Sequence, residues 1–194
     1  MLQKETLIVQ NVLFQFVGST YNGHMEQTTN NLLGGRQIME TRFQDACGKS
    51  GKVIAARLLP GTDLLTGIEE VCKKNGVDYA LVNCFGSFSE AGYMYLVPKA
   101  GAKVGAGYGD VLKQDGPVEF LSGVGVICQK DGSHDIHFHG TMCDKNGTVF
   151  GGHIVKGQNP TLTTVDVVIM EVEGVTMLRQ YDDETDLTQF YPTK

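Results

Sequence analysis

A short segment in the middle of the chain alternates imidazole and apolar side chains and then reaches a tight turn. His137 and His139 are separated by one residue, so on a β-strand both project from one face while Phe138 projects from the other. The turn Asp144-Lys145-Asn146-Gly147 contains an Asn-Gly pair, which favours a β-hairpin. A hairpin at this turn brings His153 level with residues around 138–140. The pattern therefore predicts a hairpin whose two strands carry three histidines.

These three histidines are the strongest indication of chemistry in the chain. Three imidazole nitrogens with an open fourth position suit Zn²⁺ or a similar divalent ion, so His137, His139 and His153 are expected metal ligands. Whether His153 shares the face of the other two depends on the strand register. Gly151-Gly152 just before it favours a bulge, which could re-aim its side chain. The alternative is a polar group of sheet residues that hydrogen-bond one another or water.

Residues 1–39 differ in composition from the rest of the chain. They are rich in Asn, Gln, Thr and Gly and show little periodicity, which is typical of loops or disorder. We expect an N-terminal extension, either disordered or produced by a start placed upstream of the real one at Met39. Residues 40–194 then form a single domain, which at this length can bury a sizeable core.

The patterned part of the chain predicts an α+β fold, a mixed and mostly antiparallel sheet with one principal α-helix. The helix is expected from apolar spacing over 64–72, with Thr62 or Asp63 as its N-cap and Gly76 just after its end. Strands are expected over 53–59, 78–88, 92–97, 118–129, 163–172 and 175–181, and residues 182–186 as an exposed acidic tail. Such a sheet leaves one face partly uncovered, so we expect an oligomer that buries it.

The charge distribution argues against a large nucleic-acid interface. The formal net charge is −6, and residues 40–194 carry all of it. The only adjacent basic pair is Lys73-Lys74, which a helix C-terminus explains. An acidic domain without a basic stripe is poorly suited to grip a phosphate backbone unaided, although an oligomer could assemble a local patch.

Cysteine usage and hydropathy indicate a cytoplasmic protein without a membrane partner. The five cysteines include no Cys-x-x-Cys pair and suggest no disulfide framework, which fits a reducing compartment. No stretch of about 18 apolar residues is present, so no transmembrane helix is expected. The apolar run over 7–17 is interrupted by polar residues and makes a poor signal-peptide core.

Two further residues are candidates for catalysis or substrate binding. Arg57, within an apolar strand, could clamp an anion through its guanidinium or could simply face solvent. Glu119 begins the strand that leads toward the histidines. It could support a ligand or act as a general base over a metal-bound water, or it could be a solvated carboxylate at a strand end.

Several other motifs are expected to have no catalytic role. The glycine-rich stretch Gly105–Gly109 lacks the spacing of a phosphate-binding loop and is expected to be a mobile or tightly turning loop. Gly86-Ser87 lacks a nucleophile elbow. His134 falls on the face opposite the proposed ligands, and His24 lies in a different kind of segment.

A series of short motifs occurs in order between Val53 and Tyr181. They are Arg57-Leu58-Leu59-Pro60-Gly61-Thr62-Asp63-Leu64-Leu65, Gly86-Ser87, Pro117-Val118-Glu119-Phe120-Leu121-Ser122, His137-Phe138-His139, Gly151-Gly152-His153 and Thr164-Val165-Asp166-Val167-Val168-Ile169. By their order and spacing, this part of the chain resembles the PPC domain, a family shared by plants and prokaryotes.

The resemblance implies a mixed sheet with one principal helix and a compact homotrimer. It also implies a DNA-binding label, although the plant relatives carry a separate Arg-Gly-Arg AT-hook that this chain lacks. The prokaryotic branch has His-x-His and Gly-Gly-His motifs, which His137, His139 and His153 match. This agrees with the metal site inferred from spacing.

Three functions stay open at this point. The first is a metal-binding protein with a regulatory or DNA-associated role, as the family label implies. The second is a metal-dependent enzyme that acts on a small anionic substrate through the three-histidine site. The third is a structural trimer that a metal ion stabilises. We rank the first ahead of the other two.

Overall fold

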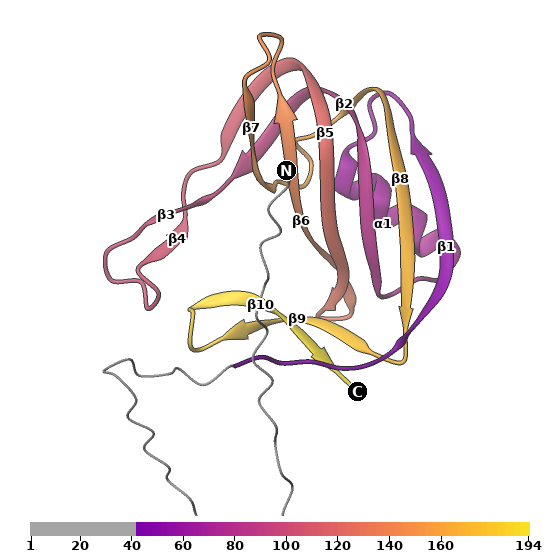
Figure 1. Cartoon of the computed structure of the whole chain (residues 1–194), viewed down its shortest axis with the longest axis vertical. Coiled ribbons are helices and arrows are strands. Elements are labelled where there is room, and N and C mark those ends of the chain that lie inside the picture. Colours follow the sequence, from indigo (N-terminus) through magenta and orange to yellow (C-terminus); the bar gives the residue numbers. More distant parts are fainter. Residues whose placement is uncertain (1–41) are drawn as a thin grey trace, which may run out of the picture. The chain divides into compact units, whose positions relative to one another are not determined.

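The computed structural model describes residues 42–194, and the expected extension over 1–39 lies outside them. Strands dominate this part of the chain, and α1 is its one helix (Figure 1). The elements in chain order are β1 (Lys49–Leu58), α1 (Leu64–Asn75), β2 (Ala80–Met94), β3 (Leu96–Pro98), β4 (Ala106–Tyr108), β5 (Leu112–Lys130), β6 (Ser133–Cys143), β7 (Val149–Ile154), β8 (Thr161–Glu173), β9 (Thr176–Asp182) and β10 (Leu187–Thr193).

One large sheet holds most of the strands, and its middle closes on itself. β1, β8, β2, β5, β6 and β7 pair in that order, and each of these pairings is antiparallel. β7 also pairs with the end of β2, where Met94 lies opposite His153, so β2, β5, β6 and β7 form a closed ring. A parallel pairing of Gln129 on β5 with Leu178 on β9 attaches the β9–β10 hairpin. The sheet is therefore mixed but mostly antiparallel, as predicted.

The helix begins and ends where local capping chemistry dictates. Asp63 is the N-cap, and its Oδ1 accepts a hydrogen bond from the Thr66 backbone N–H at 3.0 Å. Gly76 ends the helix in the left-handed conformation, which glycine adopts without steric cost. The buried side of α1, which includes Leu64 and Ile68, packs against one face of the sheet (Figure 1).

Three phenylalanine rings belong to the buried core that α1 and the sheet share. The rings of Phe88 and Phe120 lie 4.6 Å apart between centroids, and Phe138 is fully buried beside them. A Cβ atom at Gly123 or Gly125 would collide with the Phe138 ring. The two glycines that interrupt the alternation of β5 are thus the positions where aromatic rings lie against its backbone.

The opposite side of the sheet carries exposed apolar side chains. We call this surface the outer face and define it by Val53, Phe85, Val124, Val168 and Met170, which alternate with buried core residues on β1, β2, β5 and β8. Each of the five side chains is exposed. The outer face is the partly uncovered surface that the strand-rich sequence predicts.

The structure corrects two sequence-based boundaries. The strands expected over 78–88 and 92–97 are largely one strand, β2, because no turn residues interrupt it and it follows β5 through two register shifts. Residues 182–186 form a hairpin turn rather than a tail, and β10 follows them. Asp182 Oδ2 accepts the Thr185 backbone N–H at 2.9 Å, a hydrogen bond that stabilises this turn.

The described residues contain no helix with the length and apolar character needed to cross a membrane.

Asn159 connects the helix start to the sheet through a fully buried side chain. Its amide group donates to the carbonyl oxygens of Gly92 and Val155 at 3.1 and 2.8 Å and accepts the Gly92 N–H at 3.1 Å. Its own backbone N–H donates to Asp63 Oδ2 at 3.1 Å, so one carboxylate serves both the helix cap and this loop.

Replacement of Asn159 by alanine should strongly destabilise the protein. Asn159→Ala removes three side-chain hydrogen bonds and leaves the Gly92 N–H without its side-chain acceptor, which should lower the free energy of unfolding by about 2–4 kcal/mol. Denaturant unfolding measures this change. The exposed Asn75→Ala is the matched control, and it should lose less than about 1 kcal/mol. Equal losses in both variants would contradict the role given to Asn159.

Candidate metal centre

The three histidines lie together on one side of the β6–β7 hairpin. His139 pairs directly with His153 across the two strands. His137 lies two residues before His139 on β6 and therefore on the same face. One ring nitrogen from each residue lies within 4.8 Å of the others. The ring centroids are 5.1, 5.2 and 5.4 Å apart. The predicted meeting of the three imidazoles is confirmed.

Gly151 and Gly152 allow β7 to lie close to both of its neighbours. A Cβ atom at Gly151 would collide with the carbonyl oxygen of Gly140 on β6, and one at Gly152 with that of Met94 on β2. The prediction of a bulge at Gly151-Gly152 is wrong, because the β6–β7 ladder runs without a register shift. The glycines are needed for close strand packing, and this packing fixes the direction of His153.

The spacing of the ring nitrogens of His137 and His139 fits two ligands of a tetrahedral metal ion. Nε2 of His137 lies 3.2 Å from Nε2 of His139. Zinc–nitrogen bonds of about 2.0–2.1 Å at tetrahedral angles place neighbouring ligand nitrogens about 3.3 Å apart. Three imidazoles would leave the fourth position of such an ion open.

The surroundings keep the three imidazoles in the neutral form. Burial lowers the pKa of His137 to about 4, and Arg179, His153 and His139 act in the same direction. Burial, followed by His139 and Arg179, lowers the pKa of His153 to about 4, with Asp135 opposing the shift. Burial also lowers the pKa of His139. Neutral imidazole carries the lone pair that binds metals, so the three rings have this form at neutral pH.

Tyr108 on β4 contacts the ring of His153. Its hydroxyl lies 3.3 Å from Nδ1 of His153, and the two ring centroids are 5.0 Å apart. This contact leaves Nε2 of His153 available for a ligand bond.

The glycine-rich stretch around Tyr108 was expected to be a loop without a site role. It forms the short β3–β4 hairpin, whose tip carries Lys103, 3.3 Å from Asp186.

Arg179 on β9 approaches the cluster from another side. It is only 9% exposed, and its Nη1 lies 3.3 Å from Nδ1 of His137. Sequence reasoning missed this residue. The one available indication was an arginine within the apolar strand pattern over 175–181, which resembles the pattern around Arg57.

Arg57 and Glu119 lie away from the histidines within the subunit. Arg57 is exposed on β1 and donates from Nε to Oγ1 of Thr164 at 3.1 Å. Since β8, β2 and β5 lie between β1 and β6, about 4.8 Å per strand separates them by roughly 19 Å. Glu119 is exposed on β5, about 16 Å along the strand from Val124, which pairs with His139. Within one chain, neither residue contacts the cluster.

His134 lies outside the site, as predicted from its position on the strand. Its Nε2 donates to the backbone carbonyl oxygen of Val77 at 2.9 Å, on the side of the sheet that faces α1. This histidine therefore has a structural hydrogen bond and is a useful internal control for the other three.

Comparison with known proteins establishes the family. Residues 45–173 match the Plants and Prokaryotes Conserved (PCC) domain, and the chain belongs to this family, which is also written PPC. The resemblance inferred from the motif series is thereby confirmed. No curated protein matches the sequence.

Solved structures of similar proteins share the fold. A metal-containing protein from Archaeoglobus fulgidus is 26% identical, and the match covers 76% of this chain and 99% of that one, with a TM-score of 0.66. A PPC protein from Pyrococcus horikoshii is 26% identical over 76% of this chain and 97% of its own, with a TM-score of 0.64. A candidate DNA-binding protein from Bacteroides thetaiotaomicron is 17% identical over 74% and 96%, with a TM-score of 0.61. At this lower identity, the likeness concerns the fold alone.

Loss of the Tyr108 hydroxyl should weaken metal binding without affecting folding. Tyr108→Phe keeps the ring but removes the group that orients His153, and such supporting contacts typically contribute about 10- to 100-fold in affinity. Competition with a chelator measures the change. Tyr95→Phe, at an exposed position, should bind metal like the wild type. Unchanged affinity in Tyr108→Phe would show that Tyr108 does not orient this ligand.

Proposed function

We propose that this PPC-domain protein binds a divalent metal ion through His137, His139 and His153. The observation that carries the proposal is the convergence of three neutral ring nitrogens within 4.8 Å on a hairpin of fixed register. The similarity to a metal-containing protein of Archaeoglobus fulgidus supports it. An all-imidazole donor set suits zinc well, and zinc is the ion we expect.

Metal analysis of the purified, untagged protein tests this proposal. The wild type should carry about one metal ion per chain, as a single three-histidine site requires. His137→Ala and His139→Ala should each lose it, because two imidazoles hold a divalent ion far more weakly than three. His134→Gln is the matched control and should keep its metal. Full retention of metal in both alanine variants would contradict the site.

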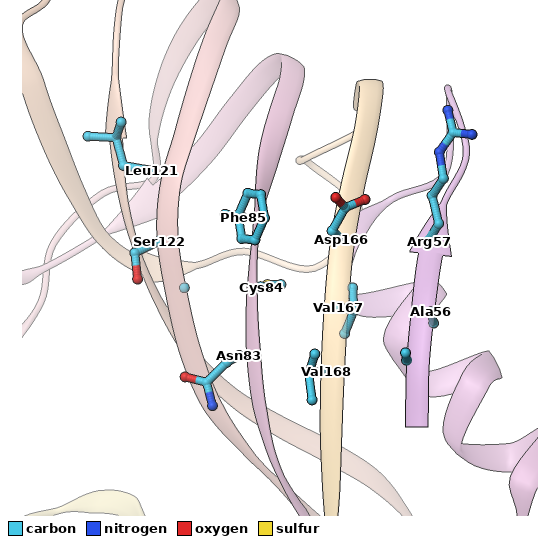
Figure 2. Close-up of a pocket in the computed structure, with 12 residues that line it drawn as sticks. Ala56, Arg57, Asn83, Cys84, Phe85, Leu121, Ser122, Asp166, Val167 and Val168 are labelled. Atoms are coloured by element: carbon cyan, nitrogen blue, oxygen red, sulfur yellow. The ribbon is translucent and has the colours of Figure 1, made fainter. Parts of the chain in front are cut away.

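We also propose that the outer face is buried in a homotrimer, the assembly that the family resemblance implies. Phe85 and Val168 expose 58% and 45% of their surfaces, and both belong to the apolar outer face. Phe85 and Val168 are among the side chains that line a hollow of about 570 Å³, which extends across β1, β8, β2 and β5. Figure 2 shows these lining residues on their strands. Exposed apolar side chains gathered on one face of a domain, here interspersed with the polar Asn83 and Asp166, mark a protein interface.

Charge placed on the outer face should disrupt that assembly. Phe85→Glu or Val168→Glu would bury a carboxylate at the interface, so each should shift the protein from trimer toward monomer. Light scattering coupled to size exclusion measures the mass. Val104→Glu, on the β3–β4 hairpin away from this face, should leave the mass unchanged. A trimer that persists in both outer-face variants would place the interface elsewhere.

The DNA-associated role implied by the family label is weakly supported in this chain. The net charge of −6 opposes binding to a phosphate backbone. If this role holds, retention on duplex DNA should fall steeply as salt rises from about 50 to about 200 mM.

The second candidate, a metal-dependent enzyme acting on a small anion, is favoured by Arg179, a buried cation 3.3 Å from a proposed ligand. In the third candidate function the metal ion only stabilises the trimer, and this function involves neither DNA nor an anionic ligand.

A further inference from the structure

Arg179 is a buried cation without a carboxylate partner. Across residues 42–194, no carboxylate oxygen comes within the 4.0 Å ion-pair distance of its guanidinium. Its Nε–H is buried and has no hydrogen-bond partner in the same part of the chain. Proteins rarely bury an unpaired charge with a free donor, because the loss of hydration is costly. This guanidinium is therefore positioned for a group that residues 42–194 do not supply.

Asp135 is the carboxylate most closely associated with the cluster, and it does not neutralise Arg179. It lies two residues before His137 on the same face of β6, opposite Cys128 on β5. Its oxygens nevertheless stay beyond ion-pair distance of the guanidinium. Within the described part of the chain, the Nε side of Arg179 consequently has no partner.

Metal binding would remove the one acceptor that Arg179 has among residues 42–194. An arginine N–H can only donate, so Nδ1 of His137 accepts from Nη1 of Arg179. In this tautomer Nε2 of His137 carries the ring proton and can donate it to Nε2 of His139. If Nε2 of His137 binds a metal ion, the ring proton belongs on Nδ1 and faces the guanidinium donors. Arg179 then needs a different acceptor beside the metal.

We propose that Arg179 binds a small oxyanion next to the three histidines, at the open side of the metal centre. This inference rests on the proposed metal-binding function and adds its ligand class, a small molecule with a carboxylate or phosphate group. The Nε and Nη2 donors of arginine form the fork that holds such groups through two parallel hydrogen bonds.

Anion binding to the purified full-length protein tests the proposal, with acetate and inorganic phosphate as probes and acetamide as the neutral control. Metal content is measured first. Calorimetry then gives the anion affinity, and cobalt-substituted protein reports through its visible spectrum whether the anion reaches the metal. Arg179→Gln should keep its metal and lose about 10- to 100-fold in anion affinity. Lys74→Gln, which removes an exposed cation on α1, should match the wild type.

The possible outcomes separate this inference from the metal-binding function. Anion affinity that is absent in the wild type, or equal in wild type and Arg179→Gln, overturns the inference while the metal content still decides the function. Protein without metal whose anion binding still depends on Arg179 supports the inference and defeats the function. Dissociation of the oligomer in Arg179→Gln, without anion binding in the wild type, overturns it in favour of a carboxylate from a second copy. If Arg179→Gln does not fold, Arg179→Lys replaces it and should show an intermediate loss.

Discussion

The antiparallel pairing of β6 with β7 is the constraint on which the candidate site depends. It places His153 directly across from His139, and the two-residue period of β6 adds His137 to the same face. A slip by one residue would turn His153 toward the opposite side of the sheet. Gly151 and Gly152 protect this register, because any larger residue would force β7 away from β6 and β2.

Around the histidines, burial and charge act together. Low hydration keeps the imidazoles neutral, and the nearby guanidinium of Arg179 strengthens the effect by repelling a protonated ring. The same guanidinium lacks an acidic partner in the described part of the chain. Its positive charge therefore lies beside the histidines, where a bound divalent ion would add further positive charge. An anionic ligand is the natural complement of such a centre. Acidic residues elsewhere in the chain give the protein its net charge of −6 and make a polyanion such as DNA a less suitable partner.

The closed ring of β2, β5, β6 and β7 explains how so much of the site comes from separate parts of the chain. β7 fits between β6 and the end of β2, and β3–β4 leaves β2 at this point, which brings Tyr108 to His153. β9 returns along the far end of β5 and presents Arg179 to His137. The hairpin supplies the three histidines, and the sheet topology supplies the residues that hold and charge them.

The sequence by itself determined the local features of this protein. The two-residue period of a strand places His137 and His139 on one face, and the Asn-Gly turn predicts the hairpin that returns His153. Capping chemistry limits the helix to the stretch between Thr62 or Asp63 and Gly76. These features depend only on residues close together in the chain. Tertiary structure decided which arginine accompanies the histidines. Arg57 and Arg179 occupy similar apolar strands, and only the order of strands in the sheet, set by long-range pairing, separates one from the cluster and brings the other to it.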